Sequence, residues 1–122
     1  MRRQESSENY LEQILILSKK QKDVRAIDIV NSMKFSKPSV SIAMKNLKQN
    51  DCINVSEKGL ITLTDKGLEI ANKVYERHCV ITQTLIQLGV PEDIAAEDAC
   101  RIEHDLSEES FIAIKKYIEK IK

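Results

Sequence analysis

A short stretch of β-type sequence in an otherwise helical chain restricts the fold more than any other feature. After Asp51, the segments INV and LITLT are rich in β-branched residues, and the turn sequence SEKG, with Gly59, separates them. This pattern predicts a small hairpin, or wing, over about 53–63. Because 122 residues can bury one modest core, we expect one compact unit or two small units that share helices.

Three amphipathic helices are predicted before the hairpin. Ser6 and Ser7 can cap the first, whose apolar stripe is Tyr10, Leu11, Ile14, Leu15 and Leu17. The second covers about 25–33, with the apolar residues Ile27, Val30 and Met33. The sequence KFSKPS then turns the chain, and Pro38 suits the first turn of a third helix over about 37–49, whose inward residues are Val40, Ala43, Met44 and Leu47.

This order of helices and hairpin is typical of a winged helix-turn-helix, in which the third helix enters the major groove of DNA. Short hydroxyls and long cations suit phosphates and base edges, so the predicted DNA-binding residues of this helix are Lys37, Pro38, Ser39, Ser41, Lys45 and Lys48. Lys58 adds a cation in the hairpin turn. Lysines alone could equally make an ordinary helix soluble, and the element order favours DNA.

Charge divides the chain into two parts. Lys+Arg and Asp+Glu both number 19, but residues 1–64 carry a net charge of +4 and residues 65–122 carry −4. The first part suits a polyanionic partner and the second suits cations. The asymmetry is modest and decides nothing by itself. Together with the element order, in which a long helix leaves the DNA-binding module, it is consistent with the predicted DNA-binding domain over 1–64 and second domain over 65–122.

The second part reads as three helices. A long helix begins near Thr64 and ends before Gly89, a helix from Pro91 runs to about Leu106, and Ser107 can cap a last helix. The last helix is strongly apolar along one side, through Phe111, Ile112, Ile114, Tyr117, Ile118 and Ile121. So small a unit with so much aliphatic surface predicts a symmetric homodimer.

The segment ACRIEHDL places three metal-ligand types on one facet of the Pro91 helix, because Cys100, Glu103 and His104 stand at i, i+3 and i+4. An apolar stripe lies on roughly the opposite side, so we expect this facet to point away from the core; the stripe is Ile94, Ala95, Ile102 and Leu106. A solvated helix face would look the same. A metal site needs a second helix, and the residues that qualify by type are His78, Glu12 and Asn9.

Several segments together resemble the diphtheria toxin repressor family of metal-dependent regulators, which includes the manganese transport regulators. They are ENYLEQILIL, SKPSVSIAMKNLKQNDCI, LTDKGLEIANKVYERH, LIQLGV and DACRIEHDLSEES, in family order over essentially the whole chain. The resemblance implies a winged helix-turn-helix followed by a helical dimerisation domain, with a divalent cation bound between the first helix and the dimerisation helices. It also implies the short architecture without the SH3-like third domain.

The resemblance assigns the metal ligands residue by residue. Glu103 and His104 match the family's Glu-His pair, and His78 matches its ligand histidine. Cys100 stands where the iron branch has a cysteine, and Glu12 matches a ligand of the manganese branch. Two departures follow. Asn9 replaces an aspartate or methionine and would ligate through its amide oxygen, and Thr82 and Ala96 replace the side chains of an ancillary site, which should be absent or altered.

Cysteine content bears on the metal. A thiolate at Cys100 favours Fe(II), with Mn(II) second, and Zn(II) or Co(II) can bind in vitro. Cys52 and Cys79 are interpreted as packing residues, and three cysteines without a CxxC pair predict reduced thiols in a cytoplasmic, soluble protein. The N-terminus shows no apolar run of signal-peptide or membrane-span length.

Taken together, the sequence predicts a non-enzymatic regulator, a repressor that is activated by metal and binds a palindromic operator as a dimer. It predicts neither a membrane partner nor a small-molecule substrate. One alternative is a winged-helix regulator that responds to thiol oxidation at Cys100 or to no metal. The other is a zinc-dependent hydrolase. The sequence argues against it, because the chain has only two histidines and no HExxH motif.

Overall fold

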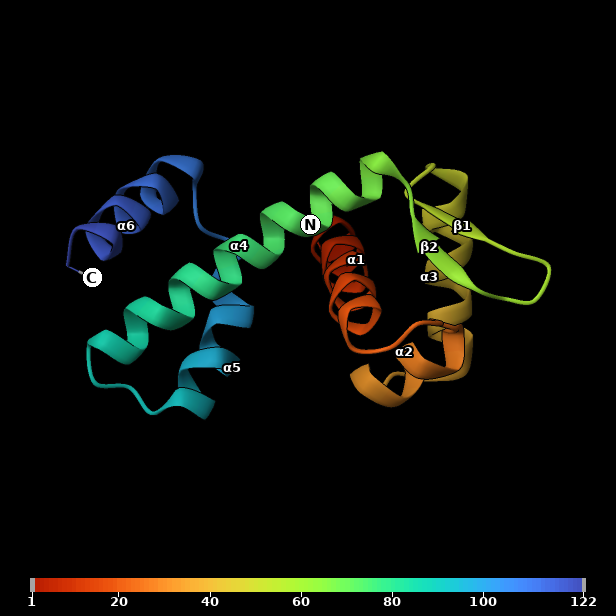
Figure 1. The fold of residues 1–122 in the computed structure, drawn as a ribbon, viewed down its shortest axis with the longest axis horizontal. Helices are drawn as coiled ribbons and strands as arrows, with labels where there is room; N and C mark the ends of the chain where they lie inside the picture. Colours follow the sequence, from red (N-terminus) through yellow and green to blue (C-terminus); the bar gives the residue numbers. More distant parts are fainter. Residues whose placement is uncertain (1, 122) are drawn as a thin grey trace. The chain divides into compact units, whose positions relative to one another are not determined.

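The computed structural model describes the backbone of residues 2–121 and the side chains of residues 7–121. The mainly helical fold with one small hairpin is confirmed (Figure 1). The elements are α1 (Arg2–Lys20), α2 (Ala26–Met33), α3 (Lys37–Gln49), β1 (Ile53–Val55), β2 (Ile61–Leu63), α4 (Asp65–Gln87), α5 (Glu92–Ile102) and α6 (Glu108–Ile121). The chain forms two compact units, Met1–Asn72 and Lys73–Lys122. The predicted domain boundary lies instead at the start of α4.

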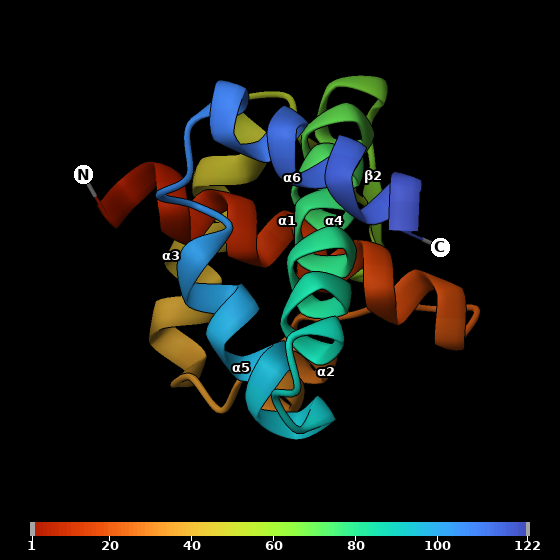
Figure 2. The ribbon, with the colours of Figure 1, turned by 90° about the vertical axis from the view of Figure 1, so that its left-hand side faces the viewer.

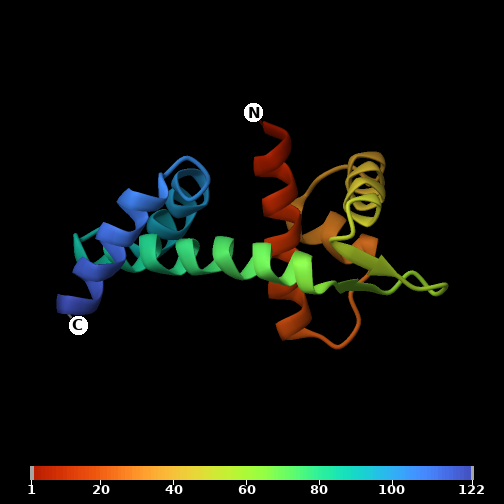
Figure 3. The ribbon, with the colours of Figure 1, turned by 90° about the horizontal axis from the view of Figure 1, so that it is seen from above.

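The first unit packs α1, α2, α3 and the hairpin around one apolar core (Figure 3). All five residues of the predicted stripe on α1 are buried. Helix α1 begins at Arg2, so the prediction that Ser6 and Ser7 cap it is wrong, because the helix continues through them. On α2 the fully buried residue is Ile29, whereas Ile27, one of the three apolar residues named from the sequence, is 44% exposed.

Local capping explains where α3 begins. The Ser36 side chain accepts a hydrogen bond from the Ser39 backbone N–H at 3.2 Å, and Pro38 occupies the first turn. Lys34 ends α2 in the left-handed region, with φ of 58°. Three of the predicted inward residues of α3 are buried and Ala43 is half-buried; the buried ones are Val40, Met44 and Leu47.

The hairpin is antiparallel, with Ile53 opposite Leu63 and Val55 opposite Ile61. Gly59 supplies the positive φ, 79°, that its turn requires. The Ile61 N–H also donates to the Val24 carbonyl at 2.8 Å, which ties the hairpin to the loop before α2. The hairpin is therefore fixed to the helical core at its base.

Helix α4 begins in close contact with β1. Thr64 caps it, since its hydroxyl accepts from the Gly67 N–H at 3.1 Å and donates to the Asp51 carbonyl at 2.6 Å. A Cβ atom at Gly67 would lie 2.0 Å from the Cys52 carbonyl oxygen. Only glycine permits this approach of helix and strand.

In the second unit, α5 runs beside α4 (Figure 2). The prediction for α5 is wrong in two respects. The helix ends at Ile102 and not near Leu106, and its buried face consists of Ala95, Ala99 and, just past its end, Glu103. Ile94 and Ile102 of the expected core stripe are 49% and 36% exposed. The buried face of α5 is therefore formed by small alanines, and the larger isoleucines of the stripe lie outside it.

Helix α6 leaves much of its apolar side in solvent. Ser107 caps it, as predicted, by accepting a hydrogen bond from the Ser110 N–H at 3.1 Å. Phe111 and Ile118 are buried, whereas the exposed large apolar residues are Ile112, Tyr117 and Ile121. Among the described residues, no helix combines the length and apolarity that a membrane crossing needs.

Candidate metal centre

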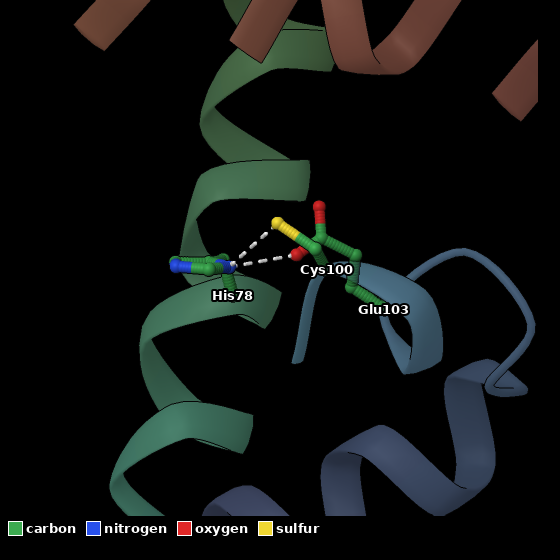
Figure 4. Close-up of side chains that lie close together, drawn as sticks. All are labelled: His78, Cys100 and Glu103. Carbon is green, nitrogen blue, oxygen red and sulfur yellow. Dashed lines mark hydrogen bonds and ion pairs between the residues drawn. The ribbon is translucent and has the colours of Figure 1, made fainter. Parts of the chain in front are cut away.

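Three of the predicted ligand side chains lie together in the second unit. One ligand atom each of His78, Cys100 and Glu103 falls within 4.8 Å of the others. Figure 4 shows His78 reaching from α4 toward the two residues at the C-terminal end of α5. The His78 Nδ1 atom is 3.0 Å from Glu103 Oε1 and 3.9 Å from Cys100 Sγ.

The expectation that this facet points away from the core is wrong for Glu103. Its side chain is 0% exposed, and the side chain of His104 is 2% exposed. His104 Nε2 lies 3.4 Å from Glu103 Oε2, so the carboxylate stands between two imidazoles. Ionised carboxylates are rarely buried unless a cation or a strong donor compensates them. Burial at this position therefore indicates a site for positive charge.

The packing of α5 explains how the cluster forms. Ala95 and Ala99 are 0% exposed, and Glu103 follows one turn after Ala99 on the same face. This face carries Glu103 inward, while Cys100, one position after Ala99, remains at the exposed margin. The cluster therefore has a buried end at Glu103 and a solvent-accessible end at Cys100.

These residues fit a divalent transition metal. Ligand atoms about 2.0–2.3 Å from one ion in tetrahedral geometry lie roughly 3.3–3.8 Å apart, so atoms that already lie within 4.8 Å of one another need only a small rearrangement. Glu103 Oε2 is buried and makes no hydrogen bond among the described residues beside its 3.4 Å ionic contact with His104 Nε2, so it can accept a metal. Imidazole, thiolate and carboxylate together suit Fe(II), Zn(II) and Co(II), and suit Mn(II) less well.

The metal-free cluster holds a proton on His78. Two contacts raise the pKa of His78 from 6.5 to about 10: the larger effect comes from Cys100 and the smaller from Glu103. Burial acts in the opposite direction. A histidine must lose this proton to bind a metal. Because the pKa is raised in the folded state, this contribution to stability is complete below pH 6.5 and disappears as pH rises through 10.

We expect metal binding to release the His78 proton, so that apparent affinity rises about tenfold per pH unit between pH 7 and 9 from this group alone. Calorimetric titrations in buffers of different ionisation enthalpy count the protons released. An NMR titration of the metal-free protein checks the cause directly, because a His78 ring that titrates near pH 6.5 contradicts the prediction.

The other two predicted ligands belong to the first unit. Asn9 and Glu12 lie three positions apart on α1, where Asn9 is half-buried and Glu12 is 5% exposed. Their participation in the metal site stays a prediction. Neither of the cysteines interpreted as packing residues belongs to the cluster; Cys52 is buried and Cys79 is exposed.

The predicted DNA-binding surface is open to solvent. All seven predicted residues are exposed: Lys37, Pro38, Ser39, Ser41, Lys45, Lys48 and Lys58. The Ser39 hydroxyl accepts a hydrogen bond from the Ser36 hydroxyl, with 2.8 Å between the two oxygens. The sequence prediction omitted Ile42, which is 62% exposed beside Ser41. Apolar side chains in the major groove can contact thymine methyl groups. An isoleucine among the hydroxyls and cations of this helix was therefore the sequence feature that could have identified Ile42 as a DNA-binding residue.

Comparison with known proteins gives consistent results. Residues 64–122 match the family described as iron dependent repressor, metal binding and dimerisation domain. An uncharacterised HTH-type transcriptional regulator of Methanocaldococcus jannaschii is 32% identical over 120 residues, which are 97% of this chain and 96% of that protein. The transcriptional regulator MntR of Escherichia coli O157:H7 is 30% identical over 118 residues, covering 97% and 76% of the two chains.

Solved structures show the same fold. The manganese regulator SloR has a TM-score of 0.82 and 28% identity over 93% of this chain, and IdeR of T. acidophilum has a TM-score of 0.83 and 26% identity over 92%. This chain spans about half the length of each of these proteins, 53% in both cases.

The fold and the cluster together define a winged helix-turn-helix protein with a candidate transition-metal site in its second unit. The relatives make the assignment specific. The chain belongs to the diphtheria toxin repressor and manganese transport regulator family of metal-dependent transcriptional regulators.

Proposed function

We propose that this protein is a repressor in metal homeostasis that binds a palindromic operator as a homodimer when a divalent transition metal is present. The observation that carries the proposal is the cluster of His78, Cys100 and Glu103, in which the carboxylate of Glu103 is buried. The exposed cations of α3 support the DNA-binding part. The reduced thiols support a cytoplasmic location.

Exposed aliphatic side chains support the dimer. In the second unit, large apolar residues remain 36% to 74% exposed on α5, on α6 and in the turn after α4: Leu88, Ile94, Ile102, Ile112, Tyr117 and Ile121. Apolar surface of this kind is normally covered by another protein chain. A twofold dimer would also present two copies of α3 to successive half-sites of an operator.

The metal set we propose is His78, Cys100, Glu103 and His104, with Glu12 and Asn9 as ligands from the first unit. The last two rest on sequence resemblance alone. Fe(II) is the metal we favour and Mn(II) is second, because a thiolate ligand prefers softer ions. Zn(II) and Co(II) should bind in vitro.

The test is an anaerobic metal titration read out by DNA binding. DNA fragments are first selected from a random library with the protein and each metal, and their affinity is then measured by fluorescence anisotropy with Fe(II), Mn(II), Zn(II) or a chelator. A coupling of about 1–3 kcal/mol would raise DNA affinity about 5- to 150-fold. Equal affinity with metal and with chelator would refute the proposal.

Replacing Cys100 with serine should change the metal preference. We expect affinity for Zn(II) and Co(II) to fall at least tenfold, because losing a ligand should cost at least as much as losing a group that only orients one. Affinity for Mn(II) should change less. The matched control is Cys79→Ser, because Cys79 is also exposed and adjoins His78 but lies outside the cluster. Equal losses for all metals would argue against a selective role of the thiolate.

Replacing Lys45 with alanine should weaken binding to every DNA sequence and lower the salt dependence of binding by about one unit of slope. Lys45 is exposed on α3, and α3 contains no acidic residue. Affinity measured from 50 to 200 mM salt checks this, with the exposed Lys116 of α6 replaced as control. An unchanged slope would remove Lys45 from the interface.

One observation favours a second candidate. Cys100 is exposed and its sulfur lies 3.9 Å from His78 Nδ1, so thiol oxidation could control DNA binding instead. Substitutions separate the two: loss of the metal response in both Cys100→Ser and Glu103→Ala supports metal sensing. Loss of a peroxide response in Cys100→Ser alone supports redox control.

A further inference from the structure

Arg77, which directly precedes His78 on α4, extends across to the turn between α5 and α6. Its side chain is 17% exposed, although arginine is rarely buried to this extent without partners. Nη1 donates hydrogen bonds to the carbonyl oxygens of Glu103 at 3.0 Å and Leu106 at 2.6 Å. Nη2 donates to Glu108 Oε1 at 3.0 Å. One guanidinium therefore contacts both ends of the turn.

These carbonyl groups need a partner. The last carbonyl groups of a helix receive no hydrogen bond from an N–H group of that helix, and the C-terminal end of the helix carries partial negative charge. Helix α5 ends at Ile102, and Arg77 places a permanent cation against the carbonyls that follow. The guanidinium also lies 5.1 Å from the centre of the Phe111 ring, so α6 packs on the same group.

Glu103 is consequently held by two consecutive residues of α4. Arg77 binds its main-chain oxygen at 3.0 Å, and His78 contacts its side-chain Oε1 at 3.0 Å. With the backbone held by Arg77, the carboxylate can move outward only by rotating its own side chain, which breaks its contact with His78. Groups that orient a ligand in this way raise the affinity of a metal site because less conformational freedom is lost on binding.

From these contacts we infer that Arg77 is a positioning residue of the metal site, which sets the backbone of Glu103 and His104 without binding metal itself. The inference rests on the proposed metal binding. Its physical basis is the fork of arginine donors, since Nη1 donates to two carbonyls while Nη2 donates to a carboxylate. Lysine has one point-like ammonium and cannot reproduce this geometry.

Replacing Arg77 with methionine should lower metal affinity about 10- to 100-fold, the usual effect of removing a group that orients a ligand. Arg77→Lys should fall between the wild type and Arg77→Met. Affinity is measured by anaerobic calorimetry with Mn(II) and Co(II). The Co(II) complex also gives an absorption spectrum, which should change in intensity and position if the ligands are reoriented and should not change if only stability is lower.

Two control variants isolate the contact with the turn. Lys115 pairs with Glu76 at 2.6 Å and so also connects α4 to α6 through a contact that involves none of the proposed ligand residues. Lys115→Met should leave metal affinity and the Co(II) spectrum unchanged. Glu108→Gln removes only the exposed ion pair of Arg77 and should lower affinity at most about fivefold. Equal losses in Arg77→Met and Lys115→Met would overturn the inference.

A measurement on the metal-free protein separates this inference from the proposed function. The Asp105 and Leu106 amides both donate to the Ile102 carbonyl, at 3.0 and 3.2 Å. Arg77→Met should speed their hydrogen exchange about tenfold or more relative to amides in the middle of α4. If the wild type bound no metal, the proposed function would fail, whereas unchanged exchange and unchanged metal affinity in Arg77→Met would refute the role of Arg77.

Discussion

Replacing Glu103 with glutamine is expected to lower metal affinity by at least about 100-fold, the upper end of the effect seen for groups that only support a ligand. Glutamine keeps the size and one acceptor oxygen of the side chain but removes its negative charge. The carboxylate is fully buried, 3.0 Å from His78 Nδ1 and 3.4 Å from His104 Nε2. Because the Glu103 side chain is 0% exposed, solvent screens the electrostatic loss only weakly.

The same substitution should leave the metal-free helices intact, as circular dichroism can show. It should also lower the pKa of His78 toward 6.5, because Glu103 is one of the two groups that raise it. The matched control is Glu97→Gln, which removes an exposed carboxylate of α5, the helix that Glu103 directly follows; Glu97 is paired with Arg101 at 3.6 Å. If calorimetry found affinity of Glu103→Gln within about threefold of the wild type, Glu103 would not be a ligand.

Replacing Gly67 with alanine is expected to destabilise the first unit by about 3 kcal/mol. The new Cβ would lie 2.0 Å from the Cys52 carbonyl oxygen and 2.9 Å from its carbon. These atoms belong to backbone, which cannot rotate away, so α4 would have to separate from β1. Alanine is the better helix former by about 1 kcal/mol, an effect of opposite sign that is too small to compensate.

Urea denaturation followed by circular dichroism measures this effect. Asn72→Ala serves as control because Asn72 is exposed on the same helix, and its replacement should change stability by less than about 0.5 kcal/mol. An equal or greater stability of Gly67→Ala would show that the contact is not tight. DNA binding should weaken with the loss of stability, since the hairpin is anchored at this contact.

Local signals were sufficient for much of the first unit. Ser36 and Pro38 start α3, and β-branched residues around Gly59 form the hairpin, because caps, proline and turn glycine act within a few residues of themselves. Ser6 and Ser7 show the limit of such signals. They are good capping residues, yet α1 begins at Arg2, because nothing local prevented the helix from continuing.

The metal cluster shows the same limit more clearly. Spacing put Cys100, Glu103 and His104 on one side of α5, and residue type together with resemblance named His78 as a partner. The expected burial was reversed, however: Ile94 is exposed and Glu103 is buried. A hydrophobic stripe predicts the inward face only when apolarity decides the packing, and here the small size of Ala95 and Ala99 decides it.

By itself, then, the sequence determined the order of the elements, the residue types of the candidate site and the family, since all three depend on local patterns. Only the tertiary structure decided which face of α5 is buried, that Glu103 lies between two imidazoles, and that Arg77 reaches two carbonyls 26 and 29 positions away. Burial and long-range hydrogen bonds depend on which elements meet, and helical periodicity carries no information about the partner helix.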